Sequence, residues 1–160
     1  MSPLPIEPHP SPARVLRQFR VVFNAVKTHF RQVEQAAGLG GAQVWALAVV
    51  RDHPGLGVKE LARTLDIQQS TASNLVRGLI ERGMVAATRD GPDRRTVALH
   101  LLDAGAAVLA RVPGPFAGVL PDALGALDAA TLARLEMDLG RLIGILGVDV
   151  EAGSVPLADL

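Results

Sequence analysis

The chain has 160 residues, of which 49% are hydrophobic and 20% charged, and this length and composition suit one globular domain with a sizeable core. It has no cysteine, which excludes disulfides, thiolate metal sites and cysteine redox switches, and no uncharged apolar run of about 18 residues that would predict a membrane span. The net charge is zero, but residues 1–54, 55–102 and 103–160 carry +3, +2 and −5, which predicts a charge dipole and only moderate non-specific attraction to a polyanion.

The first twelve residues are expected to form a proline-rich arm. Prolines recur at positions 3, 5, 8, 10 and 12, and this spacing favours extended backbone. The stretch lacks the basic start and apolar centre of a signal peptide, so we expect a cytoplasmic protein.

Two helices are predicted next. In residues 13–37, Val15, Phe19, Val22, Val26, Phe30 and Val33 recur at helical spacing and form one apolar stripe. Glycines at positions 38, 40 and 41 end this helix. Residues 42–52 are expected to form a second helix with Val44, Trp45, Leu47, Ala48 and Val49 inward, and Gly57 can cap the helix that follows.

The centre of the chain has the layout of a helix-turn-helix. Residues 58–65 are amphipathic, and Asp66 tolerates the left-handed backbone of a tight turn. A second helix is predicted over residues 69–82, with Ala72, Leu75, Val76, Leu79 and Ile80 on its inward face. Its outward face carries polar side chains: Ser70, Thr71, Ser73, Asn74 and Arg77. A polar outward face on the second helix is what a DNA-reading helix requires.

A hairpin is predicted directly after this helix. Gly83 is expected to end the helix, and residues 84–89 and 96–101 read as two strands around a turn over residues 90–95. The tip carries Arg94 and Arg95, which suit phosphates or the minor groove. Helix-turn-helix and hairpin together predict a winged helix over residues 38–102.

The C-terminal third is expected to be helical. Asp103 can cap a helix over residues 104–112, and two prolines in residues 113–115 should break it. Asp128 is expected to cap a last helix over residues 129–146, ended by Gly147 and followed by a tail, residues 148–160. Leu132, Leu135, Leu139, Leu142 and Leu146 give this helix a coiled-coil-like seam that needs a partner.

The predicted fold class is therefore mainly α with a small β-hairpin (α+β). Helices over residues 13–37 and 103–147 carry more apolar surface than a small winged helix can cover. A twofold dimer explains this surplus more simply than a monomeric core does, and we expect these two regions to form the dimerisation region.

Several of these segments together resemble the MarR family of bacterial winged-helix transcriptional regulators. The resemblance is carried by residues 60–62, 70–73, 82–85, 93–95 and 99–105, and the Asp-Arg-Arg sequence of the hairpin tip is its most specific part. The resemblance implies a short third strand at Leu56 and Gly57, and repression relieved by a small, often aromatic, acid. The absence of cysteine rules out the thiol-sensing branch of the family.

The sequence departs from the family pattern in three places. Leu102 stands where the family usually has threonine, so capping must fall to Asp103. Prolines in residues 113–115 interrupt a helix that is long in the family, and Asn74 stands where arginine is frequent. Base preference therefore cannot be carried over from the family.

The candidate DNA-binding residues are Gln69, Ser70, Thr71, Ser73, Asn74, Arg77, Arg94 and Arg95. Asn can pair with adenine and Arg with guanine through two hydrogen bonds each. For Ser70 and Thr71 the alternative is that they cap the helix and contact phosphates. In the hairpin the resemblance implies that Asp93 pairs with one arginine, so one of Arg94 and Arg95 would be structural.

Other kinds of site have little support. His29 could line the effector cavity that the resemblance implies, near Phe30 and Trp45, although a plain core or surface role is favoured. The four histidines are scattered without ligand spacing, so neither a metal site nor a cofactor is predicted. We find no catalytic constellation and expect no enzyme activity.

The leading prediction is a homodimeric regulator that binds double-stranded DNA at pseudo-palindromic operators, most simply as a repressor, with a possible small aromatic ligand. The alternative is a winged-helix module for protein interaction whose DNA binding is weak or lost. The low local charge and Asn74 support this alternative.

Overall fold

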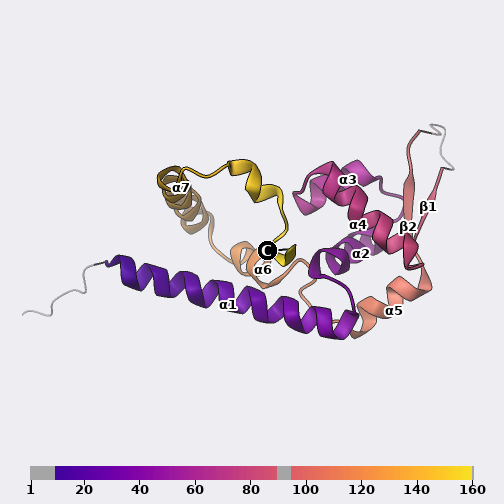
Figure 1. Ribbon diagram of the computed structural model, residues 1–160, viewed down its shortest axis with the longest axis horizontal. Coiled ribbons are helices and arrows are strands. Elements are labelled where there is room, and N and C mark those ends of the chain that lie inside the picture. Colours follow the sequence, from indigo (N-terminus) through magenta and orange to yellow (C-terminus); the bar gives the residue numbers. More distant parts are fainter. Residues whose placement is uncertain (1–9, 90–94, 160) are drawn as a thin grey trace, which may run out of the picture.

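The structure is a computed structural model that describes residues 10–89 and 95–159. In chain order its elements are α1 (Pro12–Ala37), α2 (Gly41–Asp52), α3 (Val58–Leu65), α4 (Gln69–Glu81), β1 (Val85–Thr88), β2 (Ala98–Leu101), α5 (Asp103–Arg111), α6 (Val119–Gly125), α7 (Ala129–Leu146) and the 3-10 helices η1 (Val150–Ser154) and η2 (Leu157–Asp159). This confirms a mainly α fold with a small hairpin. Figure 1 shows α3, α4 and the hairpin at one end of the molecule and α7 at the other.

The hydrophobic core is built around α2. Most of this helix is buried because α1, α3, α4, α5 and β2 all contact it. The largest fully buried side chains include Leu47 on α2, Leu61 on α3, Leu79 on α4 and Leu99 on β2. These leucines make the winged helix a packed unit, on which α4 is held in one orientation.

The turn between α3 and α4 forms as the sequence predicts. Asp66 has the left-handed backbone conformation, with φ 53° and ψ 48°. The amide of Ile67 then donates to the carbonyl of Ala62 at 3.0 Å, which closes the end of α3. This single residue redirects the chain from α3 into α4.

The end of α4 is a Schellman motif. Gly83, with φ 66°, donates to the carbonyl of Ile80 at 2.9 Å, and Met84 donates to that of Leu79 at 3.0 Å. The helix cap itself is Arg82, so Gly83, the predicted cap residue, lies one position beyond the observed cap. The motif turns the chain directly into β1.

The hairpin pairs β1 and β2 antiparallel, with Val85 opposite Leu101 and Thr88 opposite Ala98. A third strand is not formed in the described residues. However, the Gly55 amide donates to the Leu99 carbonyl at 2.8 Å and the Leu99 amide donates to the Leu56 carbonyl at 2.9 Å. Two hydrogen bonds thus attach the segment that was predicted as a short third strand to the hairpin, but the segment does not form a strand.

Four details differ from the sequence-based expectation. Leu102, not Asp103, occupies the cap of α5, and Asp103 is the first helical residue without a side-chain cap bond. Ile80, expected inward, is 40% exposed. The helix α6 and the two 3-10 helices were not predicted, because each is too short to show a hydrophobic period.

The chain breaks after α5 as predicted, and the segment at the break is attached to α1. His29, 6% exposed on α1, makes a 3.1 Å hydrogen bond between its Nε2 and the Pro115 carbonyl. Arg111 Nε donates to the Ala36 carbonyl at 3.0 Å near the other end of the connection. These two bonds hold residues 111–115 along the C-terminal half of α1.

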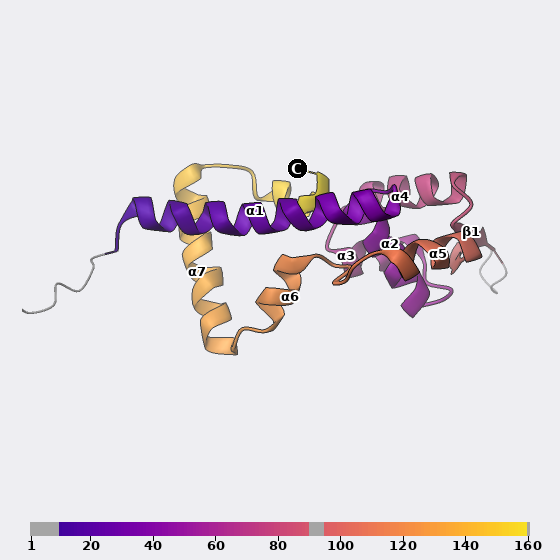
Figure 2. The ribbon, with the colours of Figure 1, turned by 90° about the horizontal axis from the view of Figure 1, so that it is seen from below.

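The terminal helices leave apolar surface uncovered. In α1 the buried residues are Val26, His29, Val33 and Ala37, whereas Val21 and Phe23 in its N-terminal half are 64% and 60% exposed. No residue of α7 is buried, and α7 lies at a steep angle to α1 in Figure 2. Together with α6 the two helices line an open groove of about 550 Å³, made mainly of Val, Leu and Phe side chains.

Candidate nucleic-acid interface

The outward face of α4 carries the predicted reading residues. Gln69, Ser70, Asn74 and Arg77 are exposed, and Thr71 and Ser73 are half-buried. The opposite face holds Ala72 and Leu79 at zero exposure and Val76 at 5%. The buried side fixes the helix on the core, so the polar side chains project together on one side.

Asn74 and Arg77 form a pair on this face. The Arg77 guanidinium donates to Asn74 Oδ1 at 3.3 Å across one turn of the helix. The contact uses one lone pair of the amide oxygen and leaves the Asn74 amide nitrogen and the remaining guanidinium donors available. Reading of adenine by Asn74 through two bonds needs both amide atoms, and the second lone pair of the oxygen can accept from the base beside the bond from Arg77.

The start of α4 is not capped by a side chain. Its cap residue is Gln68, and no side-chain cap bond forms there within the described chain. Ser70 and Thr71 therefore do not act as caps in this structure, which removes the capping part of their alternative role. The first-turn amides keep the positive end of the helix dipole open toward an anion such as a phosphate.

Two contacts position α4 against neighbouring helices. Arg82 donates to the Gly38 carbonyl at 3.0 Å, just beyond the end of α1. A Cβ on Gly78 would lie 2.9 Å from Gln43 Nε2, so the glycine leaves room for the end of this α2 side chain. Arg82 was not predicted to have a role, because nothing in the spacing of residues indicates a contact across 44 positions.

The hairpin carries the second group of predicted residues. Arg95 is exposed at the start of the returning chain. Arg94 and its predicted partner Asp93 lie outside the described residues. The base of the hairpin lies beside the end of α4, since β1 contacts this helix (Figure 1). The DNA-binding roles of Arg94 and Arg95 stay predictions.

Two carboxylates elsewhere have lowered pKa values. The hydrogen bond from Arg51 lowers the pKa of Asp52, with 2.8 Å between Arg51 Nε and Oδ1. The Thr131 hydroxyl and amide lower the pKa of Asp128 by donating to it at the start of α7. Within residues 10–89 and 95–159 no group of three His, Asp or Glu is arranged to hold a metal ion, and no helix is long and apolar enough to cross a membrane.

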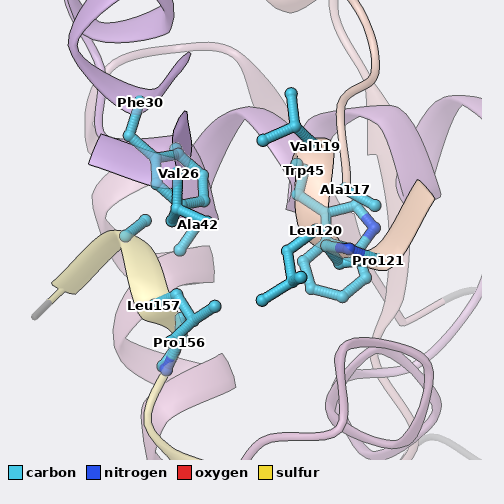
Figure 3. A pocket seen from close by; sticks show the side chains of 13 residues that line it. Val26, Phe30, Ala42, Trp45, Ala117, Val119, Leu120, Pro121, Pro156 and Leu157 are labelled. Carbon is cyan, nitrogen blue, oxygen red and sulfur yellow. The ribbon is translucent and has the colours of Figure 1, made fainter. Parts of the chain in front are cut away.

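A small cavity lies where α1, α2, α6 and the 3-10 helices meet. It measures about 70 Å³ and is lined by apolar residues, with Phe30 and Trp45 on its wall and the lining completed by Val26, Gly41, Ala42, residues 117–121 and residues 156–158. Figure 3 shows Phe30 and Val26 on one side and Trp45 and Leu120 across from them. His29 does not line this cavity, because its ring is directed to the Pro115 carbonyl. Residues 117–121 and 156–158 were missed by the sequence analysis, since no periodic signal marks them.

Sequence comparison links the chain to one family. The family model described as "MarR family" matches residues 37–96. The putative transcriptional regulatory protein for the hcr operon of Thauera aromatica is 28% identical over 123 residues, which are 76% of this chain and 69% of that protein. The HTH-type transcriptional regulator TtmR of Methylorubrum extorquens (strain PA1) is 31% identical over 116 residues, 72% of this chain and 57% of that protein. Across four such relatives the chain spans 56% to 69% of their length.

Solved structures agree on the fold. A MepR-like protein complexed with pseudoligands has a TM-score of 0.58 at 18% identity, covering 86% of this chain and 98% of that one. The MepR–DNA complex of S. aureus has a TM-score of 0.56 at 17% identity, covering 85% and 96%. At this identity the likeness concerns the fold alone, which is a winged helix with additional terminal helices.

The four relatives are named as transcriptional regulators or repressors, and these names agree with the prediction that the chain has no enzyme activity. The matched family model covers α2 to β1 and ends just before β2, and the shared fold covers 86% of the chain. The chain is thus similar to the MarR family of winged-helix transcriptional regulators, in sequence over residues 37–96 and in fold over most of its length.

Proposed function

We propose that this chain acts in the cytoplasm as a homodimeric, sequence-specific repressor that binds pseudo-palindromic double-stranded DNA and is released by a small molecule. The observation that carries the proposal is the combination of an exposed polar face on α4 with large uncovered apolar surfaces on α1 and α7. One surface suits a duplex and the other suits a second copy of the chain.

The DNA part of the proposal assigns α4 to the major groove. Ser70, Thr71, Ser73, Asn74 and Arg77 would contact base edges or phosphates, with Gln69 at the start of the helix. The hairpin, with Arg94 and Arg95, would follow the flanking minor groove. Solved structures of the same fold include MepR and MarR in complex with DNA, which supports DNA binding by this fold.

The dimer part assigns residues 13–37 and 103–147 to the dimerisation region. Val21 and Phe23 on α1 and Ile145 on α7 are 64%, 60% and 83% exposed. Exposed apolar side chains that gather on neighbouring surfaces are typical of interaction sites on proteins that function in water. Two copies joined through them would present two α4 helices about one turn of DNA apart.

The test is selection of bound sites from random duplexes, followed by anisotropy titration of the best site at several salt concentrations. We expect a pseudo-palindromic consensus and an affinity that falls steeply with salt, because Lys and Arg release counterions from phosphates. Binding that is flat across salt, or absent, would favour the alternative, a winged-helix module for protein interaction. The modest +2 charge of residues 55–102 is the observation behind that alternative.

A further inference from the structure

The cavity beside Phe30 and Trp45 is closed on one side by residues 148–159, here called the C-terminal segment. Pro156, Leu157 and Ala158 of this segment form part of the wall (Figure 3). The 3-10 helix η2 contacts both α1 and α2. The segment therefore lies where the long terminal helix meets the core of the winged helix.

The start of α2 is shaped to receive the segment. A Cβ at Gly41 would collide with the Phe30 ring and lie 3.1 Å from Ala158 Cβ. The glycine lets the aromatic ring and the segment both lie against the helix. This close fit on two sides distinguishes η2 from a segment that only passes over the surface.

Apolar contact alone holds the segment in place. Its hydrogen bonds are internal, from Val155 N to the Ala152 carbonyl, from Asp159 N to that of Pro156 and from Ser154 Oγ to that of Glu151. Within the described chain no hydrogen bond or ion pair joins it to other elements. Leu157 remains 39% exposed. This cavity wall can therefore move without breaking a hydrogen bond or opening the core.

The cavity is too small for a ligand unless a wall moves. Its volume of about 70 Å³ is well below the roughly 150 Å³ of a cavity that holds benzene and the roughly 300–1,000 Å³ of ligand pockets. The lining has no charged side chain. A carboxylate would be buried there without a partner, which is unfavourable, so the lining suits a neutral ligand better than an aromatic acid.

We propose that Pro156, Leu157 and Ala158 are a displaceable plug of this cavity, and that the uncovered site takes a neutral, apolar, ring-sized ligand in competition with the plug. The plug and its ligand site do not depend on DNA binding by the protein. Its use in regulation rests on the proposed function, because ligand entry would then separate η2 from α1 and α2 and alter how the two helices pack.

The chain reports on this site through its single tryptophan, Trp45, in the cavity wall. We would compare Leu157→Asp with Val150→Asp, a matched control in the same segment, since Val150 is 73% exposed and does not line the cavity. The probes are the neutral dye N-phenylnaphthylamine and its anionic counterpart anilinonaphthalene sulfonate. Thermal melts followed by circular dichroism verify folding of each variant.

For Leu157→Asp we expect a red shift of Trp45 emission and tighter binding of the neutral dye, by about tenfold if the plug is closed about 90% of the time. The sulfonated dye should gain less, and Val150→Asp should match the unsubstituted chain. Identical emission and dye affinity in all three proteins would overturn the plug. Equal gains for both variants would also overturn it, because they would place the dye in the open groove instead.

If Leu157→Asp unfolds the chain, Leu157→Ala gives the same comparison with a milder change and should shift emission in the same direction. DNA anisotropy in the presence of the neutral dye separates the two proposals. If the dye binds at Trp45 and DNA is not released, the plug and its ligand site are supported, but regulation of DNA binding through the plug is contradicted.

Discussion

At the residue level, the exposed face of α4 combines one long cation with short hydrogen-bonding side chains. Arg77 and Asn74 already contact each other at 3.3 Å, so neither is oriented at random before DNA arrives. Pre-oriented side chains lose less conformational entropy on binding. We therefore expect this pair to contribute more to base preference than Gln69 or Ser70.

Replacing Asn74 with alanine should cost roughly 1–3 kcal/mol at one base position and leave non-specific binding intact, because a base contact is lost while phosphate contacts remain. The measurement is anisotropy with duplexes that differ at single positions of the selected site. Thr64→Ala on α3 is a suitable control, since the Thr64 hydroxyl is already bound to the Glu60 carbonyl at 3.0 Å. A uniform loss across all duplexes would instead assign Asn74 to the DNA backbone.

Arg94→Ala should reduce the slope of log affinity against log salt by about one unit, since one phosphate contact is lost. Arg95→Ala should do the same if both arginines reach DNA. Arg134→Ala on α7, at the far end from the hairpin, is the matched charge control (Figure 1). An unchanged slope for both hairpin variants would contradict the wing assignment.

At the level of elements, α7 begins at a cap that depends on pH. Hydrogen bonds from Thr131 at 2.7 and 2.9 Å lower the pKa of the Asp128 carboxyl, so the folded state favours the charged form. The stabilisation is complete above the ordinary pKa of 3.8 and is lost as the pH falls through the lower pKa of the folded state.

Asp128→Ala should therefore lower the melting temperature at neutral pH, and the difference from the unsubstituted chain should shrink in acid. Asp128→Asn keeps a capping oxygen without the titrating group, so it should melt higher than the alanine variant and add no acid sensitivity of its own. Circular dichroism melts between neutral and acid pH give both comparisons. A difference that stays constant down to strong acid would mean that the charge of Asp128 is unimportant.

Arg82 joins the end of α4 to the end of α1, so its loss should act on both elements. Arg82→Ala removes a hydrogen bond to the Gly38 carbonyl and should lower the free energy of unfolding by about 0.5–1.5 kcal/mol. Urea unfolding measures the change, with Lys59→Ala on α3 as a control at another exposed cation. Equal midpoints for the two variants would show that the contact contributes nothing to stability.

The sequence predicted the elements that have a strong local signal. The helices α1, α2, α3, α4 and α7, the Asp66 turn and the break at residues 113–115 all follow from periodicity or from residues with special backbone preferences. The helix α6, the 3-10 helices and the bond from Arg82 to Gly38 depend on contacts between distant segments. In the site, the polar face of α4 could be predicted, but the position of His29 and the cavity wall at residues 156–158 could not, because only the folded chain brings them together.

At the scale of the whole molecule, uncovered apolar residues are concentrated on α1 and α7, away from α4. Phe23→Asp places a charge at the centre of the exposed part of α1 and should weaken dimerisation by about tenfold or more. Sedimentation equilibrium measures the change. Ala87→Asp, on the exposed side of β1, introduces the same charge at the other end of the molecule and should have no effect on dimerisation. A native chain that sediments as a monomer would contradict the dimer itself.

The separation of α7 from α4 has a consequence for how the protein approaches a target. The last third of the chain, to which α7 belongs, carries −5, whereas the parts that contain α1 to α4 and the hairpin carry +3 and +2. A strongly anionic duplex would attract the end that carries α4 and the hairpin more than the end that carries α7, so encounters with α4 forward would be favoured. The protein would thus be turned to face its target while still diffusing, and added salt would slow its arrival by weakening that torque.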